Sequence, residues 1–468
     1  MKNTTHLIFG MLALTFGMEA MAQIQLPSVF SDGMVLQQNS KVAVWGWGNP
    51  SETLMILSEW NPGDTVRTVV DNQGRWKVEV PTGCAGGPYT LEVKGGNDSR
   101  KVSDVMLGEV WLCSGQSNME WSANMGIMNG EQEVKQAACP SVRIFHNPKQ
   151  GADTPQTDCR TKWEVATPES MRKTSATAYF FARYLTEHLK VPVGILVSAW
   201  GGTPAEVWTP ADIVENDEIL AKNKLKDYPW WPIKPGVLYN QMIHPLVPYQ
   251  IAGCIWYQGE SNHENAPSYA RLVSKMVEAW RKDFGWDFPF YYVQIAPHTY
   301  GAKNNTPALL REQQELMLGQ VKNTAMINIS DLVENVKDIH PRNKRAIGER
   351  LACLAMDKVY GQFTGAYESP CLHDARVVKR NLEVTLEGNF NTLHSTTKEV
   401  TGLTVVDCTG KQVAVNARLK GKSLQIPLRG LKAPYQVYYC FDEATIGSLR
   451  TDADMPVLPF RTAKIEVK

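Results

Sequence analysis

Between residues 104 and 365, continuous apolar runs alternate with segments of helical periodicity, and this alternation constrains the fold more than any other feature. Five runs have the length of strands: VMLGEVWLC, VGILVSAW, IAGCIWYQ, FPFYYVQIA and TAMINISD. Such continuous apolar runs are typical of parallel strands that are covered on both faces. Helical patterns precede the second, fourth and fifth runs, and a further one follows the fifth run. The alternation predicts an α/β fold with a doubly wound parallel sheet.

The segments on either side of this region have the pattern of β-structure. Residues 23–103 and 366–468 hold short β-rich runs that are separated by Gly, Pro and Asn and show no helical period. We therefore expect an N-terminal β-domain over 23–103, the α/β domain over 104–365 and a C-terminal β-domain over 366–468. Residues 209–237, which are charged and rich in Trp and Pro, interrupt the alternation. They are expected to form an insertion near the functional site.

The first 22 residues have the pattern of a secretory signal peptide. Lys2 precedes the apolar run LIFGMLALTFGM, and Ala20-Met21-Ala22 offers small residues at a cleavage site. The run is too short to span a bilayer, and no later run reaches about 18 apolar residues. We expect cleavage after Ala22, a periplasmic or secreted protein, and no membrane insertion after cleavage.

The charge balance and the cysteines narrow the classes of function. The chain has 48 basic and 48 acidic residues, so its net charge gives no electrostatic argument for a nucleic-acid partner. Its nine cysteines form no CxxC motif and no Cys/His cluster with zinc-like spacing. The cysteine pattern therefore gives no indication of a zinc site. Because the number of cysteines is odd, at least one has no disulfide partner within the chain.

Polar clusters follow four of the five predicted strands. Ligands of an open parallel sheet bind beyond the carboxyl ends of its strands. The clusters are residues 114–118 (SGQSN), 201–204 (GGTP), 258–262 (QGESN) and, after a short loop, 338–341 (DIHP). The sequence predicts that these four clusters meet at one edge of the sheet.

Together the clusters supply each group that acyl transfer from a serine requires. A serine hydroxyl needs a base, the base needs an orienting carboxylate, and the tetrahedral oxyanion needs hydrogen-bond donors. Ser117 is the candidate nucleophile, His340 the candidate base and Asp338 the residue expected to orient the imidazole. The candidate oxyanion donors are the N–H groups of Ser117 and Gly202 and the side-chain amide of Gln258. Gly202 has no Cβ, so its backbone can approach a substrate closely.

Other roles remain open for these residues when each is taken alone. Ser117 is also a suitable helix N-cap, and His340 also fits an ordinary loop. His244 and His263 are alternative bases. His340 is favoured because it follows the last strand and has a carboxylate nearby. A base with the ordinary pKa of histidine predicts that activity falls between pH 8 and pH 5.

The four clusters lie in the blocks GQSNMEW, SAWGGTPAEVW, WYQGESN and KDIHPRNK. In this order they resemble the blocks of the SGNH-hydrolase superfamily and, more narrowly, of the sialate O-acetylesterase family of carbohydrate esterases. The resemblance extends to LPSVFSDGMVLQQNSKVAVWGWG, LYNQMIHPL and LPFRT, so it covers nearly the whole chain after the signal peptide.

The resemblance implies a flavodoxin-like core and the site roles given above. It also implies hydrolysis of an O-acetyl ester of sialic acid, or of a related acetylated glycan, through an acetyl-enzyme without a cofactor. Gln258 stands where the superfamily usually has Asn after the third strand. Asp338 is one residue closer to His340 than in the usual Asp-x-x-His block. Asp331 is therefore an alternative orienting acid.

Two other functions fit the sequence. An esterase for other glycans, such as acetylated xylan, would use the same catalytic residues with a different pocket. A non-catalytic carbohydrate-binding protein would not need all of them. The sequence singles out no substrate-binding residue, because Trp230 and Trp231 in the insertion fit a core position as well as a sugar contact.

Overall fold

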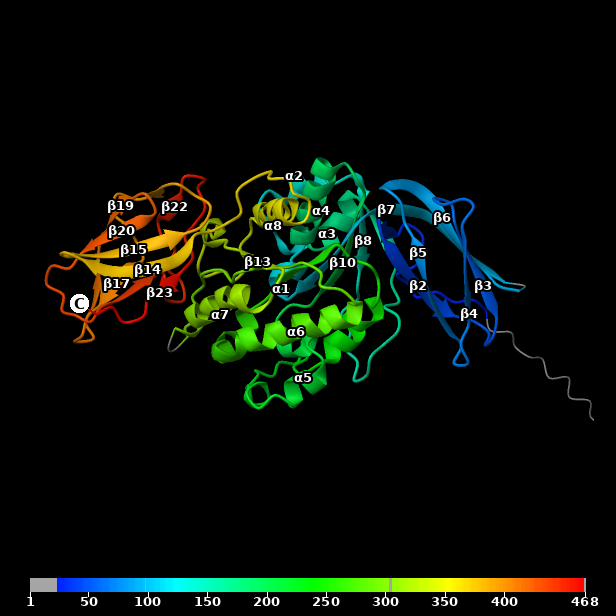
Figure 1. The fold of residues 1–468 in the computed structure, drawn as a ribbon, viewed down its shortest axis with the longest axis horizontal. Helices are drawn as coiled ribbons and strands as arrows, with labels where there is room; N and C mark the ends of the chain where they lie inside the picture. The colour runs from blue at the N-terminus through cyan, green and yellow to red at the C-terminus, as the bar shows by residue number, and fades with distance from the viewer. Residues whose placement is uncertain (1–22, 97, 303–304, 467–468) are drawn as a thin grey trace, which may run out of the picture.

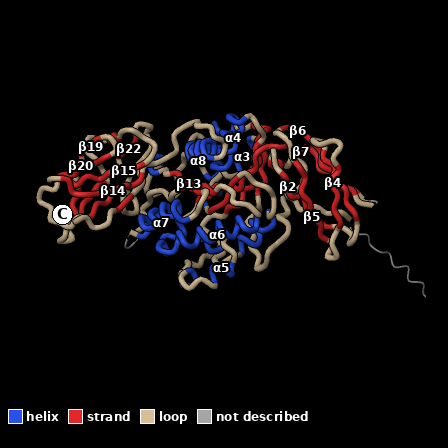
Figure 2. Tube along the Cα trace, viewed as in Figure 1, coloured by secondary structure: helices blue, strands red, loops and turns tan. Residues whose placement is uncertain are grey.

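A computed structural model describes residues 23–96, 98–302 and 305–466 of the chain. The signal peptide expected over residues 1–22 lies outside the described residues. An α/β region occupies the middle of an elongated molecule, with a β-rich region at each end (Figure 1). The long helices gather in this middle part (Figure 2).

The central sheet contains the five predicted strands in one parallel array. Its order is β13-β12-β11-β7-β10-β8-β9, and only β9 runs antiparallel to its neighbour. The strands are β7 Ser99–Gly115, β8 Cys139–His146, β9 Trp163–Ala166, β10 Val193–Ala199, β11 Gly253–Tyr257, β12 Phe290–Val293 and β13 Thr324–Ile327. The doubly wound parallel sheet is thus confirmed. Strand β8 was not predicted from the sequence, because Pro140 and Arg143 interrupt its apolar run.

Helices cover both faces of this sheet. α4 and α8 lie on one face and share a core with Cys113, whereas α6 and α7 lie on the other face with Leu112. Adjacent residues of a strand point to opposite faces, so burial on both faces produces continuous apolar runs. The helices are α1 Ser117–Glu120, α2 Gly130–Lys135, α3 Pro168–Lys173, α4 Ala176–Leu189, α5 Ala211–Glu215, α6 Tyr269–Phe284, α7 Thr306–Gln320 and α8 Lys344–Lys358.

Strand β7 joins the N-terminal β-region to the central sheet. Its first half pairs antiparallel with β6, where Arg100 lies opposite Val93. Its second half is the central parallel strand, where Cys113 lies opposite Val197 and Ile255. The boundary expected between residues 103 and 104 therefore falls within one continuous strand. The other strands of this region are β1 Val35–Gln37, β2 Lys41–Trp47, β3 Thr53–Ser58, β4 Thr65–Val69, β5 Arg75–Pro81 and β6 Gly86–Lys94.

The C-terminal β-region consists of two four-stranded antiparallel sheets and a two-stranded pair. The sheets β14-β15-β20-β19 and β18-β17-β21-β23 share one core, to which Val384, Val405, Leu424 and Val437 contribute. The region contacts α7 through Arg461, which forms a bidentate ion pair with Glu312 at 2.8 Å. The strands are β14 Cys371–Val378, β15 Asn381–Glu387, β16 Leu393–Ser395, β17 Leu403–Val406, β18 Gln412–Ala414, β19 Arg418–Lys420, β20 Ser423–Pro427, β21 Gln436–Tyr439, β22 Leu449–Thr451 and β23 Phe460–Arg461.

Three further observations concern the described ranges only. No helix in them is both long and apolar enough to cross a bilayer. No group of three His, Cys, Asp or Glu side chains there is arranged to hold a metal ion. All nine cysteines lie in these ranges and carry free thiols.

Candidate active site

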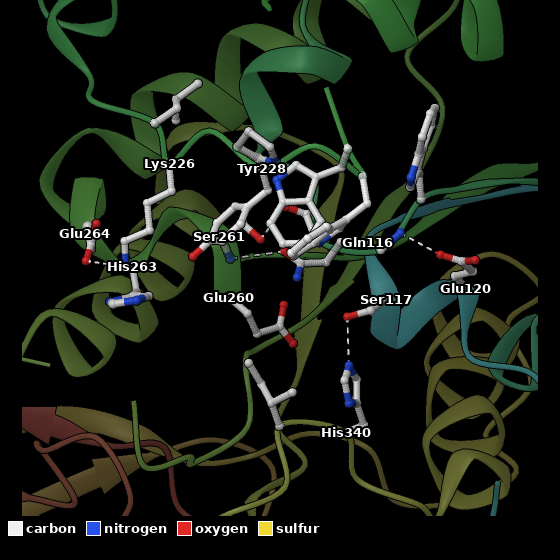
Figure 3. A pocket seen from close by; sticks show the side chains of 18 of the residues that line it. Gln116, Ser117, Glu120, Lys226, Tyr228, Glu260, Ser261, His263, Glu264 and His340 are labelled. Carbon is white, nitrogen blue, oxygen red and sulfur yellow. Dashed lines mark hydrogen bonds and ion pairs between the residues drawn. The ribbon is translucent and has the colours of Figure 1, made fainter. Parts of the chain in front are cut away.

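The predicted nucleophile and base meet at the carboxyl edge of the central sheet. Ser117 begins α1 directly beyond β7, and His340 lies in the loop before α8. Although the two residues are 223 positions apart, His340 Nε2 lies 3.0 Å from Ser117 Oγ (Figure 3). At this distance the imidazole can take the hydroxyl proton when the oxygen attacks an ester.

The turn between β7 and α1 presents Ser117 to the solvent side of the sheet. Gly115 has φ = 141°, and a Cβ there would lie 2.2 Å from the carbonyl oxygen of Tyr257 on the neighbouring strand. Glycine is therefore required for this close approach. Gln116 is the N-cap of α1, and no side chain caps the helix. The cap role that was an alternative for Ser117 is thus not realised.

Asp338 is the acid nearest to the base. Its Oδ1 lies 3.5 Å from His340 Nδ1 and accepts a hydrogen bond from the His340 N–H at 3.0 Å. Its Oδ2 accepts two bonds from the Arg342 guanidinium, at 2.9 and 2.8 Å. Burial opposes ionisation, but these hydrogen bonds outweigh it and lower the pKa of Asp338. The alternative acid, Asp331, instead forms a bidentate pair with Arg350 at 2.8 Å.

The imidazole of His340 is largely shielded from water, and its side chain is 20% exposed. The indole of Trp121 stacks on it with ring centroids 3.9 Å apart, and the guanidinium of Arg342 lies over that indole. Burial and, to a smaller extent, the positive charge of Lys344 lower the pKa of His340 from 6.5 to about 4, against the opposing effect of Asp338. The expectation of an ordinary histidine pKa was therefore wrong. The base is neutral at any pH well above 4.

Two backbone N–H groups beside Ser117 are free to bind an oxyanion. Neither the N–H of Ser117 nor that of Gly202 donates to any described group. Gly202 has φ = 81°, and a Cβ there would lie 2.2 Å from Cε3 of Trp231. The turn is held by Glu120, whose Oε2 accepts a hydrogen bond of 2.6 Å from the N–H of Gly201. Both N–H groups therefore remain candidate oxyanion donors.

The structure contradicts the role predicted for Gln258. This side chain is fully buried. Its Nε2 donates to the carbonyl oxygen of Thr203 at 3.2 Å and to Oδ1 of Asn262 at 2.7 Å. Both amide hydrogens are therefore used within the core. Gln258 braces the loops behind the site and does not donate to a substrate.

Gln116 is the amide that lines the cavity instead. Its Oε1 accepts hydrogen bonds from the N–H groups of Gly259 at 3.3 Å and Ser261 at 3.2 Å. These bonds fix the orientation of the amide and leave its NH₂ group without a partner among the described residues. Gln116 is thus the third candidate donor. Its position next to Ser117 was the available signal in the sequence.

Asn118 ties the turn of the nucleophile to the loop of the base. Its Nδ2 donates to Glu260 Oε1 at 2.6 Å and to the carbonyl oxygen of Ile339 at 3.1 Å, while its Oδ1 accepts from Lys344 Nζ at 2.5 Å. Because the Ile339 carbonyl oxygen can only accept a hydrogen bond, the amide nitrogen of Asn118 must face it, and the amide has one orientation. We call Asn118, Glu260 and Lys344 the Asn118 clamp. All three are buried, and burial lowers the pKa of Lys344 to about 7 while raising that of Glu260.

Neither alternative base contacts the nucleophile. His263 lies across the cavity from Ser117 (Figure 3), and its Nδ1 is 3.1 Å from Thr306 Oγ1. His244 lines a different cavity, and its Nδ1 is 2.7 Å from the carbonyl oxygen of Gln156. Of the three candidate bases, the structure brings only His340 to Ser117.

A cavity of about 570 Å³ opens in front of Ser117. Tyr228, Trp230 and Trp231 line it and come from the insertion expected at 209–237. Their rings form a cluster with centroids 4.5 to 5.6 Å apart. Trp230 is 62% exposed, so it is a surface residue and not a core residue. The segment expected to form an insertion near the site therefore contributes part of the cavity wall.

A parallel α/β sheet that carries a serine–histidine pair and free N–H groups at its carboxyl edge has the arrangement of a serine esterase. Comparison with known proteins identifies the family within this class. A family model described as carbohydrate esterase, sialic acid-specific acetylesterase, matches residues 107–357. The chain therefore belongs to the sialic acid-specific acetylesterase family of carbohydrate esterases.

Individual relatives resemble most of the chain. The sialate O-acetylesterase of Homo sapiens is 30% identical over 381 residues, which cover 73% of this chain and 72% of that protein. The sialate O-acetylesterase of Mus musculus is 29% identical over 409 residues, which cover 73% and 75%. A crystal structure of a carbohydrate acetylesterase from Xanthomonas citri matches with a TM-score of 0.85 and 34% identity, and covers 94% of this chain and 99% of that one.

Proposed function

We propose that this protein is a sialate O-acetylesterase, which hydrolyses acetyl esters on the hydroxyl groups of sialic acid. The observation that carries this proposal is the 3.0 Å contact between Ser117 Oγ and His340 Nε2 beside the cavity. Membership in a family described as sialic acid-specific acetylesterases supports the substrate class.

The contacts around Ser117 support acylation by a serine mechanism. Neutral His340 accepts the hydroxyl proton while Ser117 Oγ attacks the acetyl carbonyl, and the N–H groups of Ser117 and Gly202 stabilise the oxyanion. The NH₂ group of Gln116 is a third donor from the cavity wall. The imidazolium, stabilised by Asp338 at 3.5 Å, then protonates the departing sugar oxygen.

Hydrolysis of the acetyl-enzyme uses the same groups in reverse order. His340 takes a proton from a water molecule, the resulting hydroxide attacks the acetyl carbonyl, and the same donors stabilise the second oxyanion. Collapse of this intermediate releases acetate, and the imidazolium returns its proton to Ser117. The chain's own residues thus supply each proton transfer that the reaction requires.

An acetylesterase for neutral glycans is the second candidate function. The relative from Xanthomonas citri, which is 34% identical over nearly the whole chain, is described as a carbohydrate acetylesterase without a stated sugar. Acetylated xylan represents this class of substrate. It would use the same nucleophile and base.

Acetate release from matched substrates distinguishes these functions. The purified protein is incubated with mono-O-acetylated sialic acid, acetylated xylan and p-nitrophenyl acetate. We expect a higher kcat/KM for the sialic acid ester than for acetylated xylan. In Ser117→Ala, we expect kcat/KM to fall by at least about 10⁴-fold on all substrates. Higher kcat/KM for acetylated xylan would favour the second function. Activity that survives in Ser117→Ala would exclude the serine mechanism, and no activity on any ester would favour a non-catalytic binding protein.

A further inference from the structure

Three lysines line the cavity in front of Ser117, and their charges are not equally compensated. Lys149 Nζ lies 2.7 Å from Glu120 Oε1, and Lys226 Nζ lies 2.8 Å from Glu264 Oε1. The side chain of Lys224 is exposed and forms no ion pair or hydrogen bond with any described residue. Among the described residues of the cavity wall, Lys224 therefore carries the uncompensated positive charge. An anionic ligand gains more binding free energy from an unpaired cation than from a cation that already forms an ion pair.

The backbone that carries Lys224 is fixed although its side chain is free. The Lys224 N–H donates to Asn265 Oδ1 at 3.3 Å, and Asn265 Nδ2 donates to the Lys224 carbonyl oxygen at 2.9 Å. The preceding residue, Asn223, donates to Glu206 Oε1 at 2.9 Å and accepts from Ser268 Oγ at 3.0 Å. These bonds anchor the insertion to the core. A ligand therefore has only the lysine side chain to order, which lowers the entropic cost of binding.

The same wall presents an aromatic surface to the cavity. Trp230 is 62% exposed, which leaves much of its apolar surface uncovered. It is supported by Tyr228 and Trp231, whose ring centroids lie 5.5 and 5.6 Å from its own. Trp231 in turn contacts Gly202, since a Cβ on that glycine would lie 2.2 Å from its ring. The aromatic cluster therefore extends from the cavity mouth to the oxyanion donor. Indole rings bury large apolar areas, and the C–H faces of a sugar ring are apolar.

We propose that Lys224 and Trp230 form a subsite for an acidic sugar, in which the ammonium binds the sugar carboxylate and the indole packs on the sugar ring. This subsite deepens the proposed function and rests on it, because sialic acid is a sugar that carries a carboxylate. It places the sugar at the cavity wall formed by the insertion, with its acetyl group directed toward Ser117. The insertion then selects the acid, and the serine and histidine perform the hydrolysis.

Inhibition of p-nitrophenyl acetate hydrolysis tests the subsite without requiring a sialic acid ester as substrate. The inhibitors are sialic acid without O-acetyl groups and its carboxyl methyl ester, which has the same ring but no charge. We expect the acid to inhibit the wild-type protein roughly fivefold more strongly than the ester, the scale of an exposed ion pair. High salt should reduce this preference because it screens exposed charges.

Two variants separate the charge from the ring. Lys224→Met should reduce the acid-to-ester preference to about one, because the exposed charge is lost. Lys222→Met is the matched control: Lys222 is exposed on the same segment but does not line the cavity, so this variant should keep the wild-type preference. Trp230→Ala should weaken inhibition by both acid and ester by a similar factor, roughly three- to tenfold. Circular dichroism verifies the fold of each variant.

Specific outcomes would overturn the subsite. An acid-to-ester preference that is the same in Lys224→Met and wild type, or no inhibition of the wild type by the acid, refutes it. Acetate release from O-acetylated sialic acid is measured separately. A wild type that releases this acetate without preferring the acid inhibitor refutes only the subsite. A wild type that prefers the acid through Lys224 but releases no acetate from the sialic acid ester refutes only the proposed function.

Discussion

Lowering the pH tests the environment of His340 directly. The pH dependence of kcat/KM reports the pKa of the base in the free enzyme. Burial beneath Trp121 and the charge of Lys344 lower the pKa of His340 from 6.5 to about 4. Activity requires the neutral imidazole, so we expect kcat/KM to be constant from pH 8 to pH 5 and half-maximal near pH 4.

The expected effect is large enough to measure at a single pH. At pH 5, an imidazole with a pKa near 4 is neutral in about 90% of molecules, but one with a pKa of 6.5 in only about 3%. The two cases therefore differ roughly 30-fold in activity at that pH. Stability should change in the same direction. Between pH 6.5 and pH 4 the unfolded chain binds a proton at His340 that the folded chain excludes. The free energy of unfolding therefore falls as the pH falls, by about 3 kcal/mol in total from this residue.

The assay is the initial rate of acetate release from p-nitrophenyl acetate between pH 3.5 and pH 8 at constant ionic strength. Circular dichroism at each pH, and recovery of activity after return to pH 7, exclude unfolding. Trp121→Ala should move the midpoint upward toward 6.5, because water then reaches the imidazole. Trp60→Ala, in the N-terminal β-region, is the control and should leave the midpoint in place. A wild-type midpoint near pH 6.5 in folded protein would refute the shielding of His340.

Four further expectations concern single positions. Asp338→Asn should lower kcat roughly 10- to 100-fold and shift the acid midpoint lower, since its charge supports the imidazolium; an unchanged pH profile would speak against this role. Asn118→Ala leaves the buried side chains of Glu260 and Lys344 without their amide partner, so it should lower the free energy of unfolding in urea by about 3 kcal/mol. It should also lower kcat more than it changes KM. Normal kcat at reduced stability would mean that the clamp does not position the nucleophile. Gly202→Ala should lower kcat at least about tenfold, because φ = 81° and the neighbouring indole exclude a Cβ and the backbone must move to admit one. Wild-type kcat would show that the turn accepts a Cβ without displacing this N–H. We also predict export with cleavage after Ala22, which the intact mass of the exported protein checks: a mass that includes Met1 would contradict it.

The positions of the nucleophile and base followed from the sequence because both depend on backbone topology. Parallel strands with buried faces have recognisable apolar runs, and their carboxyl ends lie at one edge. The ends of the apolar runs therefore give the location of the residues that directly follow them, such as Ser117 and Gly202. His340 required only the further assumption that the loop after the last strand returns to the same edge.

The direction of side chains could not be read in this way. Gln258 and Gln116 both follow strand ends, and only the packing of the surrounding loops decides which amide faces the cavity. The Asn118 clamp joins three separate segments, so no local pattern reveals it. The low pKa of His340 arises from burial against Trp121 and was equally inaccessible. These properties depend on contacts between residues distant in the sequence, whereas strand order depends on local hydrophobicity.

The length of β7 has a consequence for how this esterase can be divided. One unbroken strand pairs with β6 at its start and ends at Gly115, two positions before the nucleophile. A fragment that begins at residue 104 would strip the strand of its antiparallel partner. This truncation would remove the pairing with β6 that helps to fix the register of β7. The register of β7 sets the position of Ser117 at the edge of the sheet. If Ser117 is the nucleophile, removal of the N-terminal β-region should therefore lower kcat, because β6 pairs with the strand that leads to Ser117.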